Sequence, residues 1–301
     1  MTETEFLSAL RTLPLHPGAL GLADDAARLG DLVLTSDTIV EGVHFLPTDP
    51  AGDVAWKLVA VNLSDLAAKG AVPEGVMLSY PLSEAGWDRG FLAGLREALT
   101  TFRAPLIGGD TVSLPASAPR VLTLTAIGQS DFPRPRSGAQ AGDALWVTGT
   151  IGDAGAGLAV ARGAKGPAGV APHISANLLY EYRRPRPLLN EGRALAPQVH
   201  AMMDVSDGLL IDAARMAAAS GLAVTIDLAR IPLSPGYMAW SGDRMAAATA
   251  GDDYELLFAL HPRARPPVPA TRIGAFAPGA GLTLTDGDEA VPLPATLGFQ
   301  H

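Results

Sequence analysis

The sequence predicts a two-domain protein of the α/β or α+β class, and three of its features support this prediction. The chain has 301 residues, about twice the common domain length of roughly 150 residues. Short, strand-like apolar runs alternate along it with longer segments that repeat apolar residues at helical spacing. A stretch rich in proline, glycine and charge lies near the midpoint, which is typical of an exposed linker.

The expected elements follow one another from the first domain into the second. The strands are expected at short apolar runs, which are Leu32 to Ser36, Gly75 to Tyr80, Leu106 to Gly108, Val121 to Gly128, Leu145 to Thr148, Ala201 to Val205, Ala223 to Asp227, Glu255 to Leu260 and Thr271 to Ala275. The helices are expected where apolar residues recur at helical spacing, in Val54 to Ala68, Trp87 to Phe102, Ala154 to Arg162, Asp207 to Ala219 and Asp243 to Thr249. This alternation is too regular for an all-α fold.

The linker is expected at Phe132 to Gly138, where proline, arginine and glycine follow one another. It divides the chain into an amino-terminal domain, 1–137, and a carboxy-terminal domain, 138–301. A second segment, Gly163 to Pro172, is rich in glycine, alanine and proline and is expected to form a surface loop.

The composition excludes several classes of function. Hydrophobic residues make up 48% and charged residues 18%, which indicates a folded rather than a disordered chain. A net charge of -9 argues against nucleic-acid binding, which needs basic residues. The absence of cysteine excludes thiol chemistry and thiolate metal sites. The acidic amino terminus and the lack of a long apolar run predict a cytoplasmic protein without a membrane span.

An acidic protein that handles phosphates needs metal ions between the two, and aspartates stand at suitable places. Asp24 and Asp25 form a pair, and Asp37 follows the hydroxyls of Thr35 and Ser36 after an expected strand. Carboxylate and hydroxyl oxygens are hard ligands of the kind that Mg²⁺ selects. A role in a turn or a helix cap is the alternative for either cluster taken alone.

Asp65 is the most informative aspartate because it lies inside the expected helix from Val54 to Ala68. This helix is apolar on nearly every face, so the carboxylate is expected to be partly buried. An unpaired buried charge is costly, and Asp65 therefore needs a cation. A metal ion is the favoured partner, and an ion pair with Lys69, four residues further along, is the alternative.

Two further clusters stand at the ends of expected strands. Gly109 and Asp110 follow an apolar run, where glycine would let a phosphate approach the backbone and the carboxylate could hold a metal, although a tight turn explains the pattern equally well. Asp204, Ser206 and Asp207 end a strand and open a helix. Helix amino termini bind anions, and two aspartates could share metal ions bound to the same anion. Capping of the helix by Asp207 is the alternative.

Familiar phosphate-binding motifs are missing from the chain. It has no Gly-x-x-x-x-Gly-Lys-Ser/Thr, and neither His-Arg-Asp nor Asp-Phe-Gly, which excludes the P-loop and protein-kinase classes. Individually weaker candidates are His44 after the Asp37 segment, Arg136 in the linker, and Asp252 in an acidic stretch before a strand.

Taken in order, these segments resemble thiamine-monophosphate kinases, within the aminoimidazole-ribonucleotide-synthetase-like superfamily. The resemblance rests on Asp24-Asp25, Ser36 to Phe45, Val61 to Ala68, Gly108 to Thr111, Asp204 to Leu209 and Gly251 to Leu256. It runs from about residue 20 to the end of the chain. The stretches Asp37-Thr38-Ile39-Val40-Glu41-Gly42-Val43-His44-Phe45 and Asp253-Tyr254-Glu255-Leu256 are more particular to the kinase than the Gly-Gly-Asp motif.

The resemblance implies two α/β domains with mixed sheets flanked by helices, and a homodimer formed through the amino-terminal domains with ATP near the subunit junction. It implies transfer of the ATP γ-phosphoryl group to thiamine monophosphate, giving thiamine diphosphate and ADP. By matching positions, Mg²⁺ ligands would be Asp24, Thr35, Ser36, Asp37, Asp65, Asp110, Asp204 and Asp207. ATP would contact Gly109, Arg136 and Ser206, and the thiamine substrate would contact His44, Asp252 and Phe299.

The implied chemistry needs alignment and charge neutralisation more than a covalent nucleophile. We therefore expect direct in-line attack by the substrate phosphate, which is already ionised near neutral pH, without a phosphoenzyme. Two positions depart from the family pattern: Asp252 stands in place of a glutamate, which shortens its reach, and Ala23 replaces a glycine before the aspartate pair.

The alternatives are another ATP-using enzyme of the same superfamily, such as a selenophosphate or aminoimidazole ribonucleotide synthetase, or a non-catalytic nucleotide- or metal-binding protein. The absence of cysteine and of an amino-terminal lysine disfavours the selenophosphate enzyme.

Overall fold

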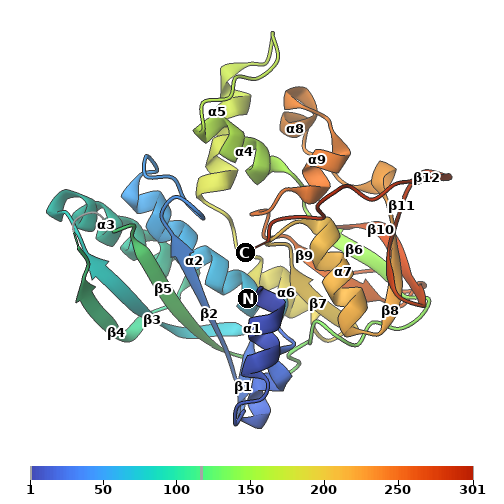
Figure 1. The fold of residues 1–301 in the computed structure, drawn as a ribbon, viewed down its shortest axis with the longest axis horizontal. Coiled ribbons are helices and arrows are strands. Elements are labelled where there is room, and N and C mark those ends of the chain that lie inside the picture. The colour runs from blue at the N-terminus through green and yellow to red at the C-terminus, as the bar shows by residue number, and fades with distance from the viewer. Residues whose placement is uncertain (1, 116–117, 301) are drawn as a thin grey trace.

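The computed structural model describes residues 2–115 and 118–300, and it contains two mixed β-sheets with helices packed against them (Figure 1). The strands of the first sheet all precede residue 130 and those of the second all follow residue 143. The α/β class with mixed sheets flanked by helices is thereby confirmed. The segment predicted as an exposed linker, 132–138, lies between the sheets, but residues 133–137 are only partly exposed. A domain boundary at residue 137 stays a prediction.

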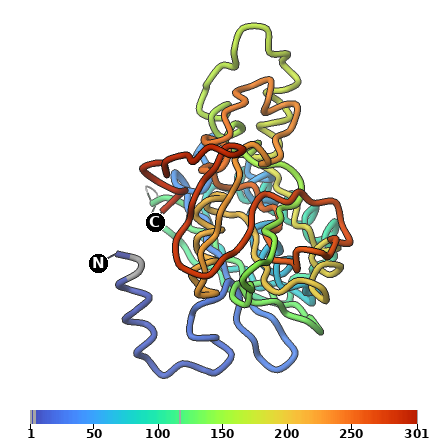
Figure 2. Tube along the Cα trace, turned by 90° about the vertical axis from the view of Figure 1, so that its right-hand side faces the viewer, coloured from blue at the N-terminus to red at the C-terminus, as the bar shows by residue number. Residues whose placement is uncertain are grey.

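The first sheet has the strand order β1-β2-β5-β3-β4. β3 and β4 run parallel, and the other neighbours are antiparallel. The elements of this half are α1 (Glu3–Leu10), the 3₁₀ turn η1 (Pro17–Leu22), β1 (Ala27–Leu29), β2 (Leu32–Val40), α2 (Ala51–Ala68), β3 (Val72–Leu82), α3 (Ala85–Phe102), β4 (Leu106–Ser113) and β5 (Val121–Gln129). Helix α1 projects from one side of the molecule (Figure 2).

The second sheet has the order β12-β11-β8-β10-β6-β9-β7, in which only β8 and β11 among the described strands run parallel. Its strands are β6 (Ala144–Thr148), β7 (Ala201–Asp204), β8 (Leu222–Asp227), β9 (Leu256–Leu260), β10 (Ala270–Pro278), β11 (Gly281–Asp286) and β12 (Glu289–Val291). Its helices are α4 (Asp153–Ala161), α5 (Pro172–Arg183), α6 (Leu189–Leu195), α7 (Leu209–Ala219), η2 (Leu228–Arg230), α8 (Pro235–Trp240) and α9 (Arg244–Thr249).

The nine predicted strands and five predicted helices are all present, with shifted ends. The sequence analysis missed nine mostly short elements: α1, α5, α6, α8, β1, β11, β12 and the 3₁₀ turns η1 and η2. Segment 163–171 forms the expected surface loop, and Pro172 begins α5 rather than ending the loop. None of the helices in the described ranges is both long and apolar enough to cross a membrane.

Helix α2 is the central element, because it packs against both halves. All its residues from Val54 to Ala68 are buried, as an apolar pattern on every face predicts. Its amino-terminal part joins the core under the first sheet, whereas Ala67 and Ala68 join a cluster with α6 and strands of the second sheet. Helix α6 approaches closely because Gly192 has no side chain; a Cβ there would lie 1.9 Å from the Ala67 carbonyl oxygen.

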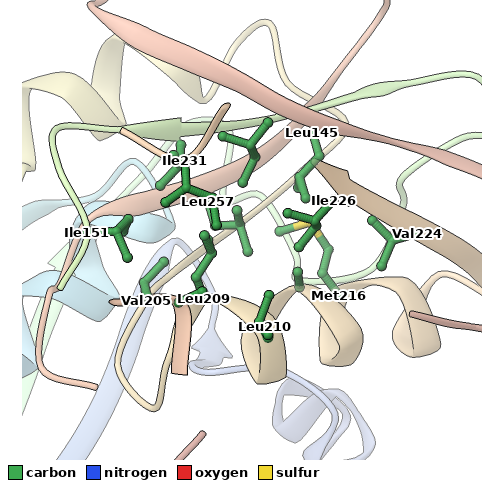
Figure 3. Close-up of a cluster of buried hydrophobic side chains, with 14 of the residues drawn as sticks. Leu145, Ile151, Val205, Leu209, Leu210, Met216, Val224, Ile226, Ile231 and Leu257 are labelled. Carbon is green, nitrogen blue, oxygen red and sulfur yellow. The ribbon is translucent and has the colours of Figure 1, made fainter. Parts of the chain in front are cut away.

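The largest cluster of buried side chains lies between the second sheet and helix α7 (Figure 3). Leu209, Leu210 and Met216 extend from α7 toward Val224, Ile226 and Leu257 of the sheet in that view. This rigid packing fixes the turn between β7 and α7, where the sequence predicts part of the site.

Candidate active site

A single cavity of about 1370 Å³ gathers most of the residues that the sequence predicts to be functional. It is large enough for two drug-sized ligands at the usual pocket volumes of roughly 300–1,000 Å³. Twelve of the fourteen predicted site residues line it, and they come from both halves of the chain: Asp24, Thr35, Ser36, Asp37, His44, Asp65, Arg136, Asp204, Ser206, Asp207, Asp252 and Phe299.

Strand β2 presents its hydroxyls and carboxylate to the cavity from within the strand, because it extends to Val40. The alternative of a turn role for Asp37 is therefore wrong. The backbone amide of Asp37 donates to Asn62 Oδ1 of α2 (2.9 Å), and the Asn62 side-chain amide donates to the Leu58 carbonyl (2.9 Å). Buried Asn62 thus ties β2 to the helix beside Asp65. The sequence predicts Asn62 only as a member of the Val61 to Ala68 segment and does not indicate this contact.

Asp65 is buried as predicted, with 8% of its surface exposed. Its Oδ2 accepts a hydrogen bond from the Thr35 hydroxyl. Burial raises the pKa of Asp65 well above its usual range, and the negative charges of Asp37, Asp204 and Asp25 raise it further. The pKa of Asp204 rises to about 7, mainly through burial and then through Asp25. The cluster therefore lacks positive charge on the side of Asp65 and Asp204.

Lys69 forms ion pairs with Asp24 and Asp25 and not with Asp65, its partner in the alternative that the sequence left open. Its Nζ donates to Asp24 Oδ1 and to Asp25 Oδ2, the latter at 2.9 Å, so the alternative of a Lys69–Asp65 ion pair is wrong. Arg136 also pairs with Asp25 through Nη2, and its backbone amide donates to Asp24 Oδ1 (3.2 Å). Although burial raises the pKa of Asp25, Lys69 and Arg136 outweigh it and hold that pKa well below the usual range.

The donor set fits magnesium, which binds hard oxygen ligands and would supply the missing positive charge. Seven predicted ligands line the cavity, and Asp65 with Asp204 are the buried carboxylates most in need of a cation. Within residues 2–115 and 118–300, no three acidic or histidine side chains converge closely enough to form a metal site as they stand. Asp24 and Asp25 instead use protein cations in this state.

The turn between β7 and α7 is held by a residue that sequence reasoning missed. Asp212 Oδ2 accepts the backbone amides of Ser206 (3.1 Å), Asp207 (3.1 Å) and Gly208 (3.2 Å). Arg215 bridges Asp212 Oδ1 (2.9 Å) and Asp207 Oδ2 (2.5 Å). Gly208 occupies the cap position of α7 without a side-chain cap, so the capping alternative for Asp207 is wrong. The signal available in the sequence was a further aspartate, Asp212, in the first turn of the helix that follows Ser206-Asp207-Gly208.

The three predicted substrate contacts lie near one another at another part of the cavity. The His44 and Phe299 rings meet edge-on, with centroids 6.4 Å apart. His44 Nδ1 accepts from the Val40 amide (3.1 Å), and the Phe299 amide donates to the Asp207 carbonyl (2.8 Å). Asp252 accepts a hydrogen bond from Lys57, whose role the sequence did not indicate.

Gly109 and Asp110 lie outside this cavity, within strand β4 at the edge of the first sheet. The cross-strand register places Asp110 beside Ser79, Ser79 beside Thr123, and Thr123 beside Thr38. Three strand spacings of about 4.8 Å put Asp110 roughly 14 Å from β2. The tight turn considered for the glycines is absent here: Gly109 lies within the strand, and a Cβ there would lie 1.9 Å from the Leu78 carbonyl oxygen.

Family models match both halves of the chain. Residues 23–130 match the N-terminal domain of AIR synthase related proteins, and residues 140–290 match their C-terminal domain. A thiamine-monophosphate kinase of Caulobacter vibrioides is 39% identical over 99% of this chain and 91% of its own. The Escherichia coli thiamine-monophosphate kinase is 38% identical over 80% of this chain and 76% of its own.

Solved structures show the same fold over the whole chain. A structure described as AaThiL complexed with AMPPCP and TMP has a TM-score of 0.86 and 28% identity, covering 100% of this chain and 97% of that one. The thiamine-monophosphate kinase of Stenotrophomonas maltophilia has a TM-score of 0.78 and 37% identity, covering 95% and 96%. The chain therefore belongs to the thiamine-monophosphate kinase family, built from the two domains of AIR synthase related proteins.

Proposed function

We propose that this chain transfers the γ-phosphoryl group of ATP to thiamine monophosphate, which yields thiamine diphosphate and ADP. The observation that carries the proposal is the single cavity in which twelve predicted metal, ATP and substrate residues meet. The related structure with AMPPCP and TMP adds support, because it pairs a nucleotide analogue with this substrate on the same fold.

The reaction brings two anionic phosphates together, so the site must neutralise charge and align the groups. Bound Mg²⁺ would screen the phosphates and polarise the transferring group. Its proposed ligands are Asp24, Thr35, Ser36, Asp37, Asp65, Asp204 and Asp207, with Asp110 from the edge strand. Arg136 and Ser206 would contact ATP together with Gly109, while His44, Asp252 and Phe299 would hold the thiamine end.

The attacking group is the substrate phosphate, which is ionised near neutral pH and needs no strong general base. We propose direct in-line attack without a phosphoenzyme, because phosphoryl transfer needs alignment and charge neutralisation more than a covalent nucleophile, and the cavity gathers carboxylates suited to metal binding. The chain's own contribution is then orientation: Asn62 positions β2, and Asp212 positions the Ser206 turn.

A homodimer through the first sheets would explain the position of Gly109 and Asp110. All eight residues of β4 are exposed, including the apolar Leu106, Ile107 and Val112. An exposed apolar edge strand is a surface that proteins normally cover. Pairing here would place Gly109 and Asp110 at the subunit junction. Size-exclusion chromatography with light scattering should give a dimer, and Ile107→Lys should weaken it.

We further propose that residues 1–137 form the ATP, Mg²⁺ and dimerisation domain and that residues 138–301 complete the site. The cytoplasm is the proposed compartment, where ATP is available to a kinase.

The deciding experiment mixes the pure protein with ATP, Mg²⁺ and thiamine monophosphate and follows both products by chromatography. We expect stoichiometric thiamine diphosphate and ADP, and neither product when Mg²⁺ is chelated. ATP hydrolysis driven instead by another substrate of the superfamily would reject the proposal. Calorimetric ATP binding without turnover of any candidate substrate would favour a non-catalytic nucleotide-binding protein.

A further inference from the structure

Lys57 of helix α2 is one of the most deeply buried charges in the described chain, with 2% of its surface exposed. Its Nζ donates to Asp252 Oδ2 (2.8 Å) and to the His44 carbonyl oxygen (3.1 Å). The same atom lies 4.3 Å from the centre of the Tyr182 ring. One ammonium group therefore contacts a loop of the first half, a loop of the second half and helix α5.

Burying an ammonium group carries a large cost in lost hydration, and an apolar side chain would often pack there at no loss of stability. The contacts to carboxylate, carbonyl and aromatic ring offset this cost only while all three partners stay in place. A buried charge in such a position thus fixes the geometry of its partners more than it stabilises the fold.

Asp252 has a particular need for such fixation. Its backbone has a φ of 71°, a left-handed conformation that is uncommon outside glycine, although aspartate adopts it more often than most residues. Its side chain is 27% exposed and borders two cavities, the one of about 1370 Å³ and a second of about 810 Å³. Lys57 binds Oδ2 while the Tyr254 hydroxyl donates to Oδ1 (3.1 Å), so both oxygens are held.

We infer that Lys57 is a positioning residue for the thiamine end of the substrate. Lys57 holds the Asp252 carboxylate close to the His44 backbone by donating a hydrogen bond to each, and it acts on the substrate through them. The inference rests on the proposed function, which assigns His44 and Asp252 to substrate binding. This role would explain how Asp252 can bind substrate although it is shorter than the glutamate that the family pattern has at this position: the hydrogen bond from Lys57 fixes its carboxylate.

The test compares Lys57→Met with the wild type, because methionine keeps the length and removes the charge. The Kd for thiamine monophosphate, measured by calorimetry without ATP, should rise about tenfold, because an Asp252 side chain freed from Lys57 must be ordered again when the substrate binds. The Kd for an ATP analogue and the KM for ATP should change less than twofold, since the side-chain contacts of Lys57 include neither Arg136 nor Ser206. Lys165→Met, in the exposed loop, is the matched control and should change nothing.

A double-mutant cycle separates positioning from a general structural role. If Lys57 acts through Asp252, adding Lys57→Met to Asp252→Asn should weaken binding of thiamine monophosphate much less than it does in the wild type. Equal weakening in both backgrounds would overturn the inference, and so would a parallel loss of ATP-analogue binding. If Lys57→Met does not fold, Lys57→Arg carries the test, because a guanidinium keeps the charge but cannot occupy the same point.

The wild type is assayed first. A wild type that neither binds nor phosphorylates thiamine monophosphate overturns the proposed function, and the inference with it. A wild type that does both, combined with unaltered binding by the lysine variants, overturns the inference alone.

Discussion

Helix α2 carries two buried lysines, one in its second turn and one at its carboxy-terminal cap, and they serve different partners. Lys57 meets one half-buried carboxylate, a carbonyl and an aromatic ring. Lys69, at the carboxy-terminal cap, meets two carboxylates that are both nearly inaccessible. Between the two lies Asp65, to which no described residue supplies a positive charge within ion-pairing distance.

The comparison shows how one helix divides the acidic cavity. The lysines neutralise the carboxylates at its margins, Asp252 at one end and the Asp24 pair at the other. Asp65 and Asp204 keep an excess of negative charge in the middle, where the pKa of each is raised by burial and by neighbouring carboxylates. That is the part of the cavity where added Mg²⁺ would lower the free energy most.

The largest effect is expected for Asp65→Asn, which removes the central charge and keeps the shape. Loss of a metal ligand is worth several kcal/mol in the transition state, so kcat/KM should fall about 100- to 1,000-fold. The free energy of unfolding without Mg²⁺ should rise, because the amide ends the repulsion from Asp37 and Asp204. Activity assays and urea denaturation measure the two effects.

Opposite signs for activity and stability are the informative outcome for Asp65. A variant with near-normal turnover at limiting Mg²⁺ would contradict its role as a ligand. A variant that loses both activity and stability would show that the carboxylate serves the fold instead.

Lys69→Met tests the carboxy-terminal end of the helix. It leaves two buried carboxylates with Arg136 as their remaining cation, and breaking such a pair costs about 3–5 kcal/mol. Urea denaturation without metal should show a loss of about 3 kcal/mol, and millimolar Mg²⁺ should restore part of it. Lys165→Met is the control. If Lys69→Met were as stable as the wild type, the pairing would carry no net stability.

A carboxylate of the second half sharpens the contrast with Asp65. Glu255 also takes a hydroxyl hydrogen bond, from Thr148 (2.5 Å), and burial raises its pKa to about 7. Because the folded state holds this proton more tightly than the unfolded state, its contribution is full below about pH 4.5 and is lost as pH rises through 7. Stability should therefore fall by up to about 1 kcal/mol per pH unit between pH 5 and 7.

Thermal unfolding at several pH values measures this slope, with Glu255→Gln as the comparison. The glutamine variant should lack that part of the slope, and Mg²⁺ should leave the difference unchanged because Glu255 is not a proposed ligand. If Mg²⁺ changed the difference in pH slope between the wild type and Glu255→Gln, a metal would bind near Glu255. Glu255 would then not differ from Asp65 in the way proposed here.

The sequence predicts most of the scaffold because its strands and long helices have strong apolar patterns. Helix α2 is an example: its apolar faces predict both its burial and the unusual setting of Asp65. The missed helix α5 packs mainly against α4, and the missed helix α6 packs against α2, and a local sequence pattern does not record such contacts. The family resemblance gathers twelve site residues that spacing alone could not bring together.

Long-range contacts account for what the sequence could not predict. Lys57 and Asp252 are 195 residues apart, and no local pattern joins them. The sequence left an ion pair between Lys69 and Asp65 open as the alternative to a metal, but the chain instead brings Asp24 and Asp25 to Lys69. Likewise Asp110 belongs to the predicted ligand set but lies at the exposed edge of the sheet, a position that only the strand order reveals.

The smallest effect is expected for Asp53→Asn, at the amino-terminal end of α2. Asp53 lies 3.6 Å from Arg184 Nε, and both side chains keep contact with water. Arg184 also pairs with Glu97 (2.6 Å) and stacks over the Trp56 ring at 4.2 Å, so it stays in place without Asp53. Partly exposed pairs contribute about 0–1 kcal/mol, and urea denaturation should show a loss within that range.

This small loss is the counterpart of the large one at Lys69. Both substitutions remove one partner of an ion pair on the same helix, and they differ in burial and in the contacts left to the remaining partner. If Asp53→Asn destabilised the protein as much as Lys69→Met, burial would not be what distinguishes the two ends. There would then be no physical reason to assign Lys69 in particular to neutralising the buried Asp24 and Asp25.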